Sequence, residues 1–145
     1  MKYKKIGEEL YLRLDKNDEI MESIQYLCEK ENILSGRICG IGACGHAIVS
    51  SYRPLLKNFT YHQASGMLEL VSLLGNVAKN KNGKPHLHLH ALFSYLNDQD
   101  QMSVLAGHLK EATISYTSEI VISPAQGLIS LRPDTYTEID VWDFE

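Results

Sequence analysis

Apolar and polar residues alternate along most of this chain, which is the period of a β-strand with one buried face. The clearest case is the segment 9–14, Glu-Leu-Tyr-Leu-Arg-Leu. An Asn-Gly pair at 82–83 favours a hairpin turn between two further strands. The pattern predicts additional strands at 35–41, 47–52, 59–63, 68–74, 86–96, 104–109, 113–122 and 128–131.

One segment has the period of a helix instead. Its apolar residues recur with a spacing of three and four, at Ile20, Met21, Ile24, Leu27 and Cys28. Residues 15–17 offer capping side chains before it, and we expect the helix to end near Asn32. About seven strands around one principal helix predict an α+β fold with a mainly antiparallel sheet.

Length and composition fit one soluble domain over residues 1–145. The chain is 44% hydrophobic and 22% charged, which is ordinary for a globular protein, and we find no repeat or linker. With no apolar run of about 20 residues and no signal core, we expect a cytoplasmic protein. Three cysteines, Cys28, Cys39 and Cys44, cannot all pair and form no Cys-x-x-Cys motif, so we expect reduced thiols.

The net charge of −4 argues against a surface built for nucleic acid. Residues 132–145 form an acidic tail with one arginine and five carboxylates, so the preceding body is nearly neutral. Basic residues gather only in two small clusters, one at Lys2, Lys4 and Lys5, the other at Lys79, Lys81 and Lys84. A protein that holds a phosphate backbone is normally more basic on at least one face.

Residues 40–45 match the Gly-x-Gly-x-x-Gly pattern of dinucleotide-binding proteins. That function requires a helix directly after the glycines, so that its N-terminus meets the phosphates. The residues that follow here, 47–52, favour a strand. The glycines therefore predict a bent corner between two strands, and we do not expect NAD or FAD.

The segment 85–90, Pro-His-Leu-His-Leu-His, carries the strongest chemical signal. In a strand, His86, His88 and His90 share one face and the two leucines point to the other. Same-face neighbours are about 6.6 Å apart, so two imidazoles can lean onto one metal ion. The competing interpretation is a half-buried sheet whose histidines face water.

A third ligand would come from another strand. His108 is the first candidate, followed by His46 and His62. Neutral imidazoles suit zinc, and less well nickel, copper or iron, and binding should weaken below about pH 6. The His-x-His pair also opens the cupin motif, but Ser94 and Tyr95 stand where a glutamate is required.

Two glutamates are candidates for supporting roles. Glu69 lies in the otherwise mostly apolar segment 67–75, where it could bind metal, act as a base or orient an imidazole. It could equally face water on an antiparallel sheet. Glu119 invites the same two interpretations.

The order of these motifs resembles that of the plants-and-prokaryotes-conserved (PPC) domain over roughly residues 9–131. A Leu-Arg-Leu strand precedes one helix, and a glycine-rich corner with Ile-Gly-Ala follows. After them come the motif Gly-x-x-Glu-Leu-x-Ser-Leu-x-Gly-Asn at 66–76, Pro-x-x-His-x-His at 85–90, Gly-His-Leu at 107–109 and Thr-x-Glu-Ile-Val-Ile at 117–122.

The resemblance implies an antiparallel sheet around one helix that assembles as a homotrimer, and a histidine metal site. His88 and His90 match the family's pair, His108 matches the histidine after its glycines, and Glu69 matches its glutamate. Ala106 replaces the first of those glycines, and His86 lies outside the pattern.

Members of the family are commonly described as predicted DNA-binding proteins, in keeping with the AT-hooks of the plant members. An AT-hook needs an Arg-Gly-Arg-Pro core. The segment 35–38, Ser-Gly-Arg-Ile, lacks it, so DNA is a disfavoured partner here.

These observations favour a homotrimeric binding and assembly protein with a histidine zinc site over an enzyme. The alternative is a metal-dependent hydrolase or lyase that acts on a small molecule, with Glu69 as its base. A purely structural trimer, whose histidines bind nothing, is the third hypothesis.

Overall fold

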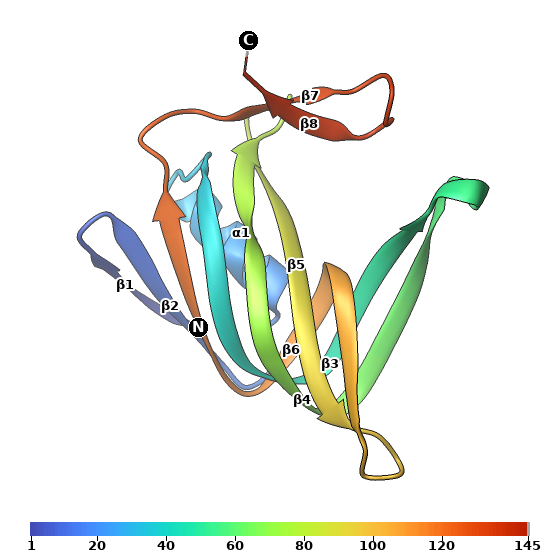
Figure 1. Cartoon of the computed structure of the whole chain (residues 1–145). Helices are drawn as coiled ribbons and strands as arrows, with labels where there is room; N and C mark the ends of the chain where they lie inside the picture. The colour runs from blue at the N-terminus through green and yellow to red at the C-terminus, as the bar shows by residue number, and fades with distance from the viewer. Residues whose placement is uncertain (145) are drawn as a thin grey trace.

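The computed structural model of the chain describes residues 1–144 and consists of eight strands, one α-helix and one 3-10 turn (Figure 1). The predicted α+β architecture with a mostly antiparallel sheet is confirmed. The elements are β1 (Lys2–Ile6), β2 (Glu9–Asp15), α1 (Ile20–Lys30), β3 (Gly36–Arg53), η1 (Pro54–Leu56), β4 (Asn58–Lys79), β5 (Pro85–Leu96), β6 (Met102–Pro124), β7 (Ser130–Pro133) and β8 (Asp140–Asp143).

The four long strands β3 to β6 form a closed ring in which each strand pairs with two others of the four. The sheet runs β1-β2-β6-β3-β4, and β5 pairs with both β4 and β6. All of these pairings are antiparallel. β7 joins β4 through one parallel pair, Lys79 with Ser130, and β8 pairs antiparallel with β7. The resulting C-terminal hairpin lies over the end of the sheet where β4 stops and β5 begins (Figure 1).

Long, bent strands replace several of the short strands that the sequence predicts. The glycine-rich segment 40–45 lies inside the continuous strand β3, where the register shifts twice, between Gly40 and Gly42 and again between Cys44 and His46. A bulge adds a residue without a partner and reverses the alternation beyond it. A strand with two bulges therefore looks in the sequence like two strands with a corner between them.

The helix covers the inner face of the curved sheet, as its apolar stripe predicts. Four of its side chains are buried in the core: Ile20, Ile24, Leu27 and Cys28. Its N-cap is Glu19 rather than residues 15–17, because one carboxylate oxygen of Glu19 accepts from the backbone N–H of Glu22 at 2.6 Å. The other accepts from the N–H of Ala112 on β6 at 2.9 Å, which ties the start of the helix to the sheet.

Two short strands, β1 and β8, were not predicted from the sequence. β8 lies within the predicted acidic tail, whose last residue, Glu145, is outside the described residues. None of the helices in the described part of the chain is long and apolar enough to cross a membrane.

Candidate metal centre

Three histidines from two adjacent strands converge on the outer face of the sheet. One ring nitrogen from each of His88, His90 and His108 lies within 4.8 Å of the others. The Nε2 atoms of His88 and His90 are 3.3 Å apart. The ring centroids of the three pairs are separated by 5.1 to 5.5 Å. Three imidazoles at this spacing can turn their nitrogens toward one metal ion.

The strand register brings these side chains together. On β5 the histidines alternate with buried residues, so His86, His88 and His90 lie on the outer face while Leu87 and Leu89 enter the core. His90 is directly opposite His108 on β6. Opposite residues of an antiparallel pair have their side chains on the same face, about 5 Å apart.

The surroundings keep two of these imidazoles neutral. Partial burial, followed by the positive charge of Lys110 and the neighbouring histidines, lowers the pKa of His108 to about 4. The pKa of His88 is also lowered, first by desolvation and then by His90 and His86. Neutral imidazole is the form that binds a metal, so both side chains are ready to act as ligands near neutral pH.

Ser50 extends the histidine row by one strand and was missed in the sequence. It is directly opposite His108 on β3, which places its hydroxyl on the face that carries the histidines. The side chain is only 2% exposed, and its Oγ has no hydrogen-bond partner among the described residues. A buried hydroxyl without a partner is costly, and a polar group bound beside His108 could supply one. No spacing in the sequence pairs Ser50 with His108, because only the β3–β6 register does so.

The other candidate residues lie outside this cluster. His86 is on the same face of β5, His46 bonds through Nδ1 to the Ser65 hydroxyl at 2.8 Å, and His62 is opposite Val49. Glu69 is opposite Ser94, four residues farther along β5 than His90, which is roughly 13 Å at the usual strand rise.

Neither glutamate joins the cluster within the described residues of one chain. Glu119 is opposite Arg13 and Ile41, and its carboxylate accepts from the Thr117 hydroxyl at 3.4 Å. The supporting roles of Glu69 and Glu119 stay predictions.

The cysteines offer no second site. All three are unpaired in the described part of the chain. Burial raises the pKa of Cys28 and of Cys44 to about 12, so neither thiol is ionised at neutral pH.

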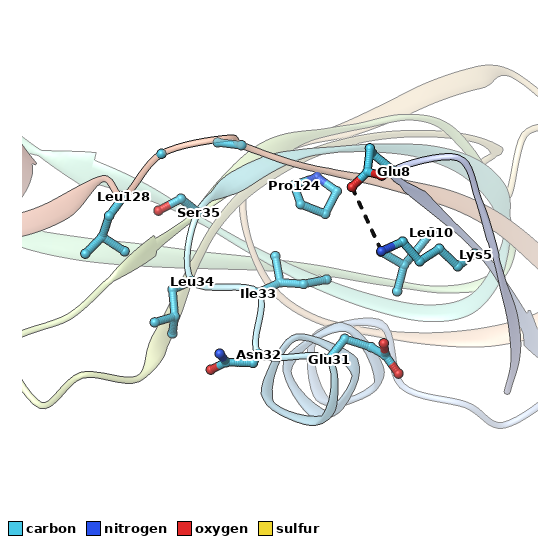
Figure 2. A pocket seen from close by; sticks show the side chains of 12 residues that line it. Lys5, Glu8, Leu10, Glu31, Asn32, Ile33, Leu34, Ser35, Pro124 and Leu128 are labelled. Carbon is cyan, nitrogen blue, oxygen red and sulfur yellow. Dashed lines mark ion pairs between the residues drawn. The ribbon is translucent and has the colours of Figure 1, made fainter.

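Two hollows on the surface have similar volumes, and one of them includes candidate metal ligands. One, of about 390 Å³, lies between the start of β5 and the C-terminal hairpin and includes His86 and His88. The other, of about 370 Å³, lies beside the C-terminal end of α1 (Figure 2). Its rim carries an exposed ion pair between Lys5 and Glu8 at 4.0 Å, and it contains none of the predicted site residues.

Comparison with known proteins places the chain among similar sequences and structures. The model of the Plants and Prokaryotes Conserved (PCC) domain family, the PPC family that the sequence resembles, matches residues 1–126. No curated protein matches the chain.

Three solved structures are similar over nearly the whole chain. A "putative DNA-binding protein" from Bacteroides thetaiotaomicron is 29% identical, with a TM-score of 0.89 over 99% of this chain and 96% of its own. A metal-containing protein from Archaeoglobus fulgidus is 26% identical, with a TM-score of 0.81 over 98% of this chain and 99% of its own. A plant- and prokaryote-conserved protein from Pyrococcus horikoshii is 26% identical, with a TM-score of 0.78 over 98% and 94%.

Proposed function

The chain belongs to the Plants and Prokaryotes Conserved domain family, and from this premise we propose that it is a metal-binding member whose ligands are His88, His90 and His108. The observation that carries the proposal is the convergence of their three ring nitrogens within 4.8 Å. The metal content of the similar Archaeoglobus fulgidus protein supports it.

Zinc fits this donor set best among the divalent transition metals. Three neutral imidazoles with one open position are a common zinc environment in proteins. Bound there, zinc would supply a Lewis acid next to the outer surface of the sheet. The chain's own contribution is to keep His88 and His108 unprotonated and to place the unpartnered Ser50 hydroxyl on the face that carries the histidines.

The proposal includes assembly as a homotrimer. A shallow hollow on the sheet exposes Ile41 and Val71, which are 56% and 49% exposed, around Glu69. Exposed apolar side chains that gather in one hollow can mark a surface that a partner covers. A second copy packed on this face would bury these side chains and bring its own groups to Glu69.

A DNA partner has less support than the metal. The similar Bacteroides protein carries that name, and Lys79, Lys81 and Lys84 gather around the turn between β4 and β5. Against it stand the net charge of −4 and the absence of an AT-hook core from the sequence. The enzymatic alternative has less support, because Glu69, its candidate base, lies roughly 13 Å along the strand from the histidine cluster.

Metal content of the protein purified without a histidine tag tests the proposal. We expect near-stoichiometric zinc after incubation with zinc and dialysis, because three preformed ligands face one point. The double variant His88→Ala/His90→Ala should lose it. His86→Ala is the matched control, since it removes an imidazole from the same face of the same strand outside the cluster.

Two results would contradict the metal site. One is a wild-type protein that retains no zinc; the other is a double variant that retains as much as the His86→Ala control. Far-UV circular dichroism of each variant shows whether the fold is intact.

A further inference from the structure

A cleft of about 390 Å³ separates the histidine face of the sheet from the C-terminal hairpin. Its floor is formed by Asn76 on β4 and by His86 and His88 on β5. His88 also belongs to the three-histidine cluster. The cleft therefore opens directly beside the candidate metal centre.

The hairpin supplies an apolar wall. Leu131 of β7, Ile139 in the turn, and Val141 and Trp142 of β8 line the cleft from this side. Trp142 is 42% exposed and Ile139 is 55% exposed, so much of their apolar surface is left without a cover. Ligand sites typically combine such apolar walls with a few polar groups that fix orientation.

The two ends of the cleft differ in charge. A divalent ion held by three neutral imidazoles keeps its positive charge, and Lys110 adds to it, since its charge lowers the pKa of both His88 and His108. The acidic side chain that lines the cleft is Asp140, at the start of β8 on the hairpin side. An anionic group is therefore attracted to the histidine end and repelled from the hairpin end.

From these observations we propose that the cleft binds a small monocarboxylate with a flat apolar body. The carboxylate lies beside His88 at the metal, the body packs on Trp142 and Ile139, and Asp140 rejects ligands with a second negative charge. This inference rests on the proposed metal site. The hairpin, residues 130–143, lies beyond the part of the chain that matches the family model, 1–126.

Phenylacetate is a suitable probe because it has one carboxylate and one ring. Trp142 is the only tryptophan in the sequence, so its fluorescence reports on this cleft directly. We expect phenylacetate to change the Trp142 emission of the zinc-loaded protein. Acetate, which has no apolar body, should bind at least roughly tenfold more weakly than phenylacetate. Phenylacetamide, which has no charge, should also bind weakly.

Variants separate the two ends of the ligand. By calorimetry, Trp142→Ala should weaken phenylacetate binding roughly tenfold while leaving the zinc content unchanged. Asp140→Asn should admit 1,4-phenylenediacetate, which the wild type excludes; continued exclusion by this variant would overturn the role of Asp140. Tyr136→Ala is the matched control, because Tyr136 is on the same hairpin, 93% exposed and outside the cleft.

Each failure has its own signature. Zinc-loaded protein that does not bind phenylacetate overturns the cleft and leaves the metal site standing, whereas protein that takes no zinc overturns both. Equal binding of phenylacetamide overturns the placement of the carboxylate at the metal. Trp142 emission that changes with protein concentration and not with phenylacetate shows that a second copy covers the cleft, which also overturns the proposal.

Discussion

His108 is the ligand candidate whose pKa the folded structure lowers to about 4. Its neighbours on the outer face are His88 and His90 from β5 and Lys110 from its own strand, all of which disfavour a further positive charge. Partial burial, followed by the charges of these neighbours, lowers its pKa to about 4, from about 6.5 for an unperturbed imidazole. Protonation of this imidazole is therefore easier in the unfolded chain than in the folded one.

This difference predicts how the metal-free protein responds to acid. Between the two pKa values the unfolded state binds more protons at His108, so the free energy of unfolding falls as pH decreases from about 6.5 toward about 4. We expect the urea midpoint to decrease over this range. His108→Gln should remove part of the decrease.

The same urea titration with His62→Gln provides the control, since His62 is an exposed histidine of the same sheet outside the cluster. If the urea midpoints of the wild type and His108→Gln depended on pH in the same way, protonation of His108 would not be the cause of the decrease.

At the residue scale, alternation in 85–90 was enough to predict that His88 and His90 share a face, and the structure confirms it. His108 could be suggested but not placed, because its position depends on the β5–β6 register. Ser50 and Trp142 could not be found at all. Each reaches the site through a contact between distant segments, and no local period records such a contact.

At the scale of elements, Gly75 allows β4 to lie close to β5 opposite Leu89, the residue between His88 and His90. A methyl group built on Gly75 would meet the carbonyl oxygen of His88 and the side chain of Leu89. Because the obstacle is the backbone of the strand that carries two of the candidate ligands, it cannot move aside without shifting them.

Gly75→Ala should therefore lower both stability and zinc retention. Overpacking of this kind typically costs about 1–3 kcal/mol in the free energy of unfolding. Chemical denaturation and metal analysis measure the two effects. Gly127→Ala is the comparison, since nothing lies within 4 Å of a methyl group at that position. Equal stability of the two variants would show that β5 tolerates displacement.

The sequence predicts the elements unevenly, for physical reasons. The helix spanning Ile20–Lys30 has a clear apolar stripe and ends close to the expected residue. Strands β3, β4 and β6 were each predicted as two pieces, because bulges and exposed stretches interrupt the alternation. β1 and β8 lack a buried face of apolar residues, so no alternation indicates them.

At the scale of the whole molecule, the exposed apolar hollow around Glu69 predicts self-association. We expect sedimentation to give a mass three times that of the chain, because the family resemblance implies a homotrimer. Val71→Asp should shift the protein toward monomer, because it replaces an apolar contact with a second carboxylate beside Glu69 on each copy. Ile6→Asp is the control, since Ile6 is 53% exposed on the distant strand β1.

A wild type that sediments as a monomer at all concentrations would contradict the trimer. If Val71→Asp left the trimer intact, the contact between copies would lie outside the hollow around Glu69. The class of fold followed from periodicity alone, whereas assembly depends on which exposed side chains gather on one face, and only the folded sheet shows that.

The outermost strand also restricts how copies can meet. β1 pairs with β2 alone in the described part of the chain, so its other side presents unpaired backbone groups that could template another strand. Three of its five residues, Lys2, Lys4 and Lys5, are lysines. Two such edges brought together would repel, and the short length leaves few hydrogen bonds to compensate. The sheet therefore resists growth into open-ended fibrils at this edge, which leaves its faces for closed, countable assemblies.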